Sequence, residues 1–170
     1  MSWFFSNINT LKEPKKDTLA SKAKGHYFRD ALAIQIDKKE LTPSQLQHAI
    51  FSHMPVWVTL LMRIRNKLVK LVGFTVGADN LTPTRDELAI GDKAGFLTIS
   101  EKYDNEIISY SEDKHMSFYL SVLKESDQVI VSTLVNQKTL IGRLYVNSIL
   151  PFHYVIARTV LNNAIKDHRV

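Results

Sequence analysis

Apolar and polar residues follow two different periods along this chain, and these periods predict where strands and helices lie. The apolar positions over residues 27–36 are Phe28, Ala31 or Leu32, Ile34 and Ile36. Such near-alternation predicts a half-buried first strand. The polar residues 37–40 are expected to end it in a turn.

Two short helices are expected after this strand. Thr42 can cap free helical amides with its hydroxyl, and Pro43 fits the first helical position because no N–H is needed there. This helix is predicted to end near residue 51. Pro55 prevents a smooth continuation, so a second helix is predicted from about residue 56 until Gly73 terminates it.

The second helix is predicted to be amphipathic. Its apolar residues recur at alternating spacings of four and three: Trp57, Leu61, Ile64, Leu68 and Leu71. Arg63, Lys67 and Lys70 fall on its other face. We interpret this pattern as a core-facing helix with a solvated basic side. A helix lying on a membrane surface is the alternative.

Residues 97–135 show the alternation and polar turns of consecutive hairpins. The segments 97–103, 108–110, 116–122 and 129–135 predict a four-stranded antiparallel meander. Phe118 and Tyr119 must point to opposite faces, and we predict that Phe118 points inward. Residues 73–95 contain four glycines and Pro83, which predict an extended connection with at most one short strand near 87–90.

A long helix is expected at the end of the chain. Ser148 can cap it, and Pro151 is tolerated in its first turn. Its apolar surface comprises Phe152, Val155, Ile156, Val160, Ala164 and Ile165. The concave side of the meander is the nearest apolar surface that can cover it. The predicted fold class is therefore α+β, with a curved antiparallel sheet of five or six strands around a C-terminal helix and two short helices after the first strand.

Length and composition predict a single globular domain. The 170 residues are 45% hydrophobic, which suffices for one core, so we expect a domain over 27–170 and a basic arm over 1–26 that is loose or wraps the domain. No apolar run is long enough to span a bilayer, and no secretory signal is evident, which predicts a cytoplasmic protein. The chain contains no cysteine, so disulfides and thiolate chemistry are excluded.

Positive charge is concentrated in the first half of the chain. The net charge is +5, and residues 1–78 hold twelve basic and five acidic side chains. Such asymmetry can attract anionic lipid or nucleic acid. Nucleic-acid binding is disfavoured because no zinc-finger spacing or aromatic RNA-binding strand accompanies the charge. A peripheral contact with an anionic membrane stays open.

A few polar residues are candidates for chemistry. His115 could be a general base oriented by Asp113, although both could equally bond locally at a turn. His153, in the first turn of the predicted last helix, is a second candidate, with a packing role as the alternative. Arg143 could pair with a ligand carboxylate or phosphate, or tie its loop to Asp113.

Several common site types have no support in the sequence. The six histidines include no HExxH spacing, which predicts no metal site. No GxGxxG, GxxxxGK[ST] or GxSxG motif occurs, so no cofactor is predicted.

Three blocks of residues resemble a known family. They are Pro55, Trp57, Leu61, Arg65, Asn66, Leu68 and Gly73, then Asp113, His115, Phe118, Ser121 and Val122, and finally Gly142, Arg143, Leu144, Tyr145, Pro151, Phe152 and His153. Together they resemble an uncharacterised bacterial domain-of-unknown-function family of the START and birch-pollen-allergen-like helix-grip superfamily (SRPBCC). The resemblance spans roughly residues 27–165. It implies a sheet wrapped round the C-terminal helix, with a cavity for apolar ligands and no established reaction. The basic arm and a count of five or six strands, instead of the usual seven, depart from that pattern.

The resulting hypothesis is a protein that binds an apolar or amphipathic small molecule, such as a lipid or polyketide, between the sheet and the C-terminal helix. The expected ligand-binding residues are Trp57, Tyr110, Phe118, Arg143, Tyr145 and His153. One alternative is a cofactor-free cyclase, hydrolase or isomerase in the same cavity, although the sequence favours a non-enzyme. The other is an interaction module that uses the basic helix and arm at an anionic membrane or a protein partner. The sequence leaves the oligomeric state open.

Overall fold

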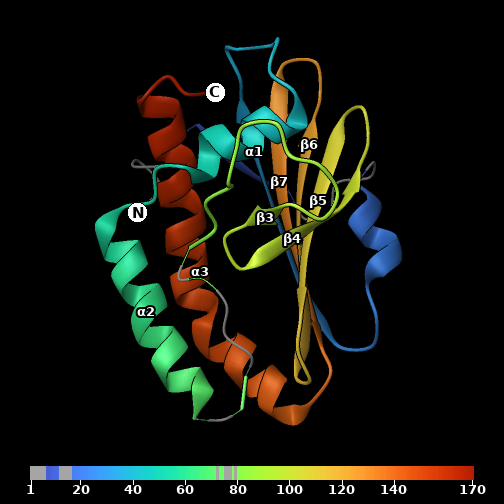
Figure 1. Ribbon diagram of the computed structural model, residues 1–170, viewed down its shortest axis with the longest axis vertical. Coiled ribbons are helices and arrows are strands. Elements are labelled where there is room, and N and C mark those ends of the chain that lie inside the picture. The colour runs from blue at the N-terminus through green and yellow to red at the C-terminus, as the bar shows by residue number, and fades with distance from the viewer. Residues whose placement is uncertain (1–6, 12–16, 72, 75–77, 79) are drawn as a thin grey trace.

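One antiparallel sheet organises the part of the chain that the structure describes (Figure 1). The computed structural model describes residues 7–11, 17–71, 73–74, 78 and 80–170. The elements are β1 (Ile8–Leu11), the 3-10 helix η2 (Thr18–Lys22), β2 (Tyr27–Gln35), α1 (Pro43–Phe51), α2 (Val56–Lys70), β3 (Lys93–Ala94), β4 (Leu97–Lys102), β5 (Glu106–Glu112), β6 (Met116–Lys124), β7 (Gln128–Gln137) and α3 (Leu140–Lys166). Within these residues the seven strands lie in the order β1-β2-β7-β6-β5-β4-β3.

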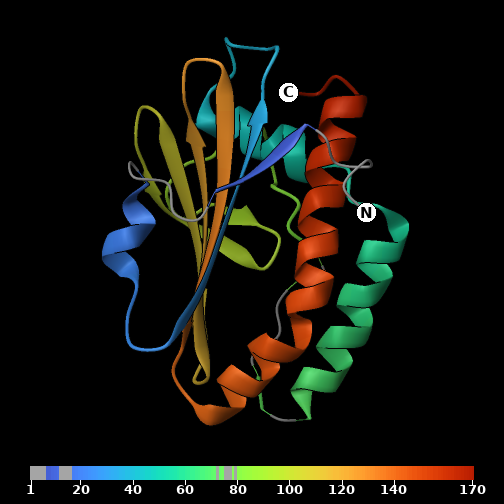
Figure 2. The same cartoon turned by 180° about the vertical axis from the view of Figure 1, so that it is seen from behind.

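The helices α1, α2 and α3 lie on one side of the sheet, while η2 lies on the other (Figures 1 and 2). In both views α1 crosses one end of the sheet, α3 runs along it, and α2 lies beside α3. This arrangement confirms the predicted α+β class, with a curved antiparallel sheet and a long C-terminal helix. None of the helices in the described ranges has the length and apolar content needed to cross a membrane.

The main core lies between the sheet and the helices. Alternation along the strands sends one set of side chains to this side. The buried members include Leu32, Ile34, Leu120 and Val122 from the strands, Leu46 and Ile50 from α1, and Val160, Leu161 and Ala164 from α3. Phe118 is partly buried against the same cluster, as the alternation of its strand requires.

The opposite, outer face of the sheet is covered at one place by η2. Leu19 of η2 is fully buried against Ile108 and Leu134. The chain then continues over residues 23–26 along this face before it enters β2. The outer face is therefore partly covered by the segment that precedes β2.

The last helix begins earlier than the sequence predicts. Thr139 is its N-cap and accepts a 3.1 Å hydrogen bond from the Gly142 N–H through its hydroxyl oxygen, so Ser148 is inside the helix. Pro151 is also inside it. The helix tolerates this proline because the carbonyl that loses its donor belongs to Asn147, which is exposed and accessible to water.

The predicted core-facing stripe of α2 is wrong. Trp57, Ile64, Leu68 and Leu71 are 41% to 84% exposed, whereas Val58, Asn66 and Val69 are buried. The reason is the position of α2 beside α3, where only one side of the helix is covered (Figures 1 and 2). An amphipathic pattern indicates two faces, but it does not state which face finds a partner.

The strand predicted near residues 87–90 is also wrong, since the short strand in this connection is β3 at Lys93–Ala94. The turn after β3 depends on Gly95, whose φ is +63°. A Cβ at this position would lie 1.9 Å from the carbonyl oxygen of Asn80, a distance that no side chain could accept. The seven strands exceed the predicted five or six because β1 and β3 are only four and two residues long.

Candidate functional site

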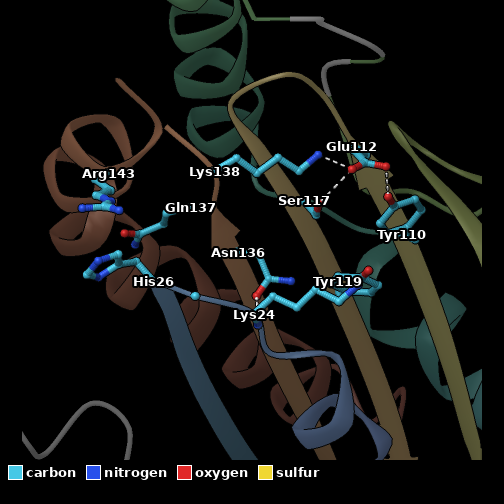
Figure 3. A pocket seen from close by; sticks show the side chains of 11 residues that line it. Lys24, His26, Tyr110, Glu112, Ser117, Tyr119, Asn136, Gln137, Lys138 and Arg143 are labelled. Carbon is cyan, nitrogen blue, oxygen red and sulfur yellow. Dashed lines mark hydrogen bonds and ion pairs between the residues drawn. The ribbon is translucent and has the colours of Figure 1, made fainter. Parts of the chain in front are cut away.

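A pocket opens on the outer face of the sheet, near the start of β2 and the end of β7 (Figure 3). Its volume is about 520 Å³. The lining residues are Lys24, Gly25, His26, Tyr110, Glu112, Ser117, Tyr119, Asn136, Gln137, Lys138 and Arg143. They come from the segment before β2, from β5, β6 and β7, from the connection between β7 and α3, and from the first turn of α3, so the tertiary fold assembles this pocket from distant parts of the chain.

The floor of the pocket is formed by strand residues that point to the outer face. Tyr110 of β5 and Tyr119 of β6 are paired in register, and their ring centroids are 4.7 Å apart. Asn136 of β7 is buried beside them. The two rings provide an aromatic surface on which an apolar or conjugated group could pack.

One wall is the segment that leads into β2, and Asn136 holds it in place. The side-chain oxygen of Asn136 accepts a 2.9 Å hydrogen bond from the Lys24 N–H. Its side-chain nitrogen donates a 2.9 Å bond to the Lys22 carbonyl. A single buried amide therefore positions the backbone that carries Lys24 and His26 (Figure 3).

The same segment is anchored further back by η2. Asp17 caps η2 by accepting a 2.6 Å hydrogen bond from the Leu19 N–H, and its carboxylate lies 2.8 Å from Arg29. Both side chains of this ion pair are almost completely buried. The Thr18 N–H also lies 3.3 Å from the buried carboxylate of Glu106. These polar contacts fix η2, and hence the wall of the pocket, to the sheet.

Glu112 is the one carboxylate among the lining residues, and it is already engaged within the protein. It accepts hydrogen bonds from Lys138, from the Tyr110 hydroxyl, and from Ser117 at 3.2 Å. The bond from Lys138 and then that from Tyr110 lower the pKa of Glu112 to about 2. Burial, followed by the bond to Glu112, raises the pKa of Tyr110. Glu112 is therefore a charged, occupied acceptor at neutral pH.

Other donors of the lining lack such acceptors. Among the described residues, no hydrogen bond or ion pair engages the side chains of Lys24, His26, Gln137 or Arg143. The Nε of Arg143 is buried without a partner. Figure 3 shows the Arg143 guanidinium close to Gln137 and His26, on the side away from Glu112. This side can thus receive a negatively charged group.

Arg143 is placed there by a close contact at the start of α3. A Cβ on Gly142 would lie 2.4 Å from the backbone oxygen of His115, so only glycine permits this approach of α3 to the turn between β5 and β6. The helix begins at this contact, with Thr139 as its cap. Arg143 follows Gly142 directly and therefore projects from the first turn of α3.

The structure brings together only two of the residues predicted to bind a ligand. Tyr110 and Arg143 line the outer pocket. Phe118 lies on the opposite face of the sheet, where its ring packs 5.9 Å from that of Phe96. His153 is on the same side as Phe118, and its Nε2 lies 3.0 Å from Asp30.

Trp57 and Tyr145 belong to the two-helix layer formed by α2 and α3. The hydroxyl of Tyr145 accepts a hydrogen bond from Arg65, whose guanidinium lies 5.4 Å from the centre of the same ring. Trp57 is 41% exposed on α2. These two aromatic residues therefore lie apart from the pocket in Figure 3.

The candidate catalytic residues make contacts of another kind. The Asp113 carboxylate accepts hydrogen bonds from the backbone N–H groups of His115 and Met116, at 2.7 and 2.9 Å. The Nδ1 of the buried His115 lies 2.9 Å from the hydroxyl of Thr139. His153 is inside α3, so the expected placement in a first helical turn is wrong. In the described parts of the chain, no three His, Asp or Glu side chains are grouped to hold a metal ion.

Most of the lining residues were not foreseen from the sequence. The run Asn136, Gln137 and Lys138 at the end of an otherwise apolar strand is the local signal that could have indicated a polar site. Lys24 and His26 offered no such signal, because they lie in a segment without periodicity. Their part in the pocket depends on how η2 packs across the sheet.

A family model matches residues 22–160. The chain belongs to the DUF2867 family, described as a protein of unknown function. All eleven lining residues lie within the DUF2867 match, as do α1, α2 and the strands from β2 to β7. Searches of curated proteins and of solved structures found no match.

Proposed function

We propose that this DUF2867 protein binds an amphipathic small molecule through a carboxylate or phosphate group, in the pocket on the outer face of the sheet. The observation that carries the proposal is the Arg143 guanidinium, which lines the pocket and makes no hydrogen bond or ion pair among the described residues. A guanidinium that no acidic side chain neutralises can bind an anionic ligand. Arginine suits this task because its planar group can bind a carboxylate or phosphate through two hydrogen bonds.

The charge of the lining residues favours an anion. Lys24, Lys138 and Arg143 are cationic, and Glu112 is the single acidic residue of the lining. Because Lys138 is bonded to Glu112, Lys24 and Arg143 remain available to a ligand. The side chains of His26 and Gln137 add further hydrogen-bonding groups beside Arg143 (Figure 3).

The size and floor of the pocket favour a small organic ligand over a lone ion. A volume of about 520 Å³ falls within the range of roughly 300–1,000 Å³ typical of small-molecule sites. The Tyr110 and Tyr119 rings can pack against the apolar part of such a ligand while Arg143 holds its charged end. The proposal thus keeps the amphipathic ligand of the sequence-based hypothesis and gives it a different place.

The place expected from the sequence was the space between the sheet and α3. Packing on that side supports the outer face instead, because α1 inserts Leu46 and Ile50 into the core there. Gln47 of α1 is also fully buried and donates a 2.9 Å hydrogen bond to Ser109 of β5. A ligand between the sheet and α3 stays a prediction, and binding experiments can separate the two locations.

Native mass spectrometry of the gently purified protein, followed by denaturation, is the first test. A stoichiometric species that carries a carboxylate or phosphate is the expected result. Isothermal titration with decanoate, decyl phosphate, decanol and inorganic phosphate then separates the charged group from the alkyl chain. Decanoate or decyl phosphate should bind more tightly than decanol or inorganic phosphate.

Variants locate the ligand. Arg143→Met should weaken binding of the anionic probe by about 10- to 100-fold, the value of a charge-assisted hydrogen bond. Arg85→Met is the matched control, because Arg85 is exposed and is not one of the lining residues. Tyr119→Ala should also weaken binding. The opposite pattern would refute the outer pocket and favour the space between the sheet and α3. In that pattern Phe118→Leu lowers the affinity, whereas Arg143→Met and Tyr119→Ala leave it unchanged.

A further inference from the structure

Large apolar side chains are exposed together on the two-helix layer of α2 and α3. On α2 and its last turn they are Val56, Trp57, Leu60, Ile64, Leu68 and Leu71. On α3 they are Leu140, Ile141, Leu144, Phe152 and Val155. Their exposed fractions range from 41% for Trp57 to 86% for Val56. A single exposed leucine is ordinary, but a contiguous apolar surface on this scale marks an interaction site.

On each helix these residues form one stripe. At roughly 100° of rotation per residue, the exposed apolar residues of α2 fall in a sector about 120° wide, and those of α3 do the same. A stripe of this width is what a helix of a globular protein normally turns toward its core. Here each stripe lies opposite the buried side of its own helix, which is marked by Val58 and Val69 on α2 and by Val146 and Val160 on α3.

The two stripes face the same way. The helices run antiparallel, side by side, in both views (Figures 1 and 2), and Arg65 of α2 contacts Tyr145 of α3. At roughly 100° of rotation per residue, Arg65 lies between the exposed stripe and the buried side of α2, and Tyr145 lies between the exposed stripe and the buried side of α3. For antiparallel neighbours that order places both stripes on one outer face of the layer. We call this surface, made of the residues above, the α2–α3 face.

The charged side chains of α2 and α3 are all basic. Neither α2 nor α3 contains an aspartate or glutamate, whereas the chain has 17 of them elsewhere. Arg63, Lys67 and Lys70 lie along the edge of α2 that is remote from α3. Arg158 lies along the remote edge of α3, where it donates hydrogen bonds to the Tyr154 carbonyl and the Thr10 hydroxyl. The apolar surface is thus bordered by three basic residues along α2 and by one along α3.

We propose that the α2–α3 face binds the surface of an anionic lipid bilayer, with α2 and α3 lying in the plane of the interface. Apolar side chains would enter the boundary between headgroups and acyl chains, while the bordering lysines and arginines contact lipid phosphates and carboxylates. Trp57 suits this depth, because aromatic residues concentrate at membrane–water interfaces. A second copy of the chain fits less well, because an isologous contact would bring two acid-free, basic surfaces together. The proposal does not rest on the proposed small-molecule function.

Sedimentation of the full chain with vesicles tests the membrane contact. Vesicles of phosphatidylcholine with 30% phosphatidylserine, taken as roughly physiological in charge, should pellet the protein at low salt, and pure phosphatidylcholine vesicles should pellet far less. Raising the salt should release it, because the attraction to charged lipid is screened. Equal sedimentation with neutral and anionic vesicles, or none with either, would overturn the proposal.

Variants on the face separate apolar from charged contributions. Leu60→Ser with Ile64→Ser should lower partitioning by about tenfold or more, since two large side chains lose their apolar contact. Lys67→Gln with Lys70→Gln should lower it by about thirtyfold at low salt. The matched control for the apolar change is Ile90→Ser, because Ile90 is 67% exposed and lies outside the α2–α3 face. The matched control for the charge change is Lys38→Gln with Lys39→Gln, since these two lysines are exposed in the turn after β2.

Two further readouts keep the result unambiguous. Circular dichroism should show wild-type folding for all variants, because the changed residues are exposed. Light scattering in the absence of lipid should report the same mass for wild type and for Leu60→Ser with Ile64→Ser. A dimer that this double variant dissociates, together with unchanged vesicle binding, would overturn the proposal in favour of self-association. Control variants that lose as much vesicle binding as the face variants would overturn it as well.

Discussion

The buried ion pair between Asp17 and Arg29 is expected to be the strongest anchor of the segment that forms the pocket wall. Their side chains are 0% and 4% exposed, and the closest oxygen and nitrogen are 2.8 Å apart. The pair is incompletely bonded, since the second oxygen of Asp17 and the Nε and Nη2 of Arg29 make no hydrogen bond in the described structure. Removal of one partner leaves the other charge buried, which costs about 3–5 kcal/mol.

A double-mutant cycle measures this coupling. Arg29→Met and Asp17→Asn should each destabilise the protein by about 3–5 kcal/mol. The asparagine can still cap η2, so the Asp17→Asn effect reports chiefly the lost charge. The double variant should cost only about 1–2 kcal/mol, because neither charge is left alone and the wild-type pair is imperfectly bonded. The coupling between the two sites is then about 4–9 kcal/mol in magnitude at these limits, well above the scatter of such measurements.

Urea unfolding followed by circular dichroism is the assay. The urea midpoints should shift, while the slope of the unfolding free energy against urea concentration stays constant. A constant slope indicates that the substitutions change the stability and leave the compactness of the unfolded state unchanged. Additive effects of the two substitutions, or single effects below about 1 kcal/mol, would refute the argument, because they would mean that both charges are solvated in the folded protein.

Three other outcomes are expected. Gly142→Ala should lower the free energy of unfolding by about 1–3 kcal/mol, as the new Cβ would lie 2.4 Å from the His115 backbone oxygen; an unchanged urea midpoint would contradict this contact. The pKa of Glu112 is lowered from 4.5 to about 2, so its stabilisation is present above pH 4.5 and fades between there and pH 2. Because Glu112 is 46% exposed, this pH-dependent stabilisation amounts to about 1 kcal/mol or less. In the Glu112→Gln variant, Tm should therefore fall less steeply than in the wild type as the pH drops from 4.5 to about 2. Burial raises the pKa of Glu106, so its ionisation should cost stability as the pH rises above 4.5, and Glu106→Gln should reduce that fall in unfolding measurements between pH 4 and 7.

Local features of the sequence were sufficient for most of the secondary structure. The Thr42 and Pro43 pair predicted the start of α1, and Thr42 does cap it through a hydrogen bond from the Gln45 N–H. Alternation over residues 116–122 predicted β6 and the opposite orientations of Phe118 and Tyr119. These predictions succeeded because capping and alternation depend on neighbours within a few residues.

The start of α3 and the exposure of α2 needed more than local information. Ser148 and Thr139 are both reasonable caps, and the choice depends on the close approach of Gly142 to His115 across the fold. The pattern on α2 showed an apolar face, yet only the packing of α2 beside α3 left that face exposed.

By itself, the sequence determined the α+β class, the order of most elements and the excess of basic residues on α2, since each depends on composition or short spacings. Tertiary structure alone decided where the pocket lies and which residues line it. Lys24 and Arg143 are far apart in the chain, and they line one pocket because η2 crosses the outer face of the sheet while α3 begins at its end. Long-range packing of this kind selects among faces that local patterns leave equivalent, and therefore the site appears only in the folded chain.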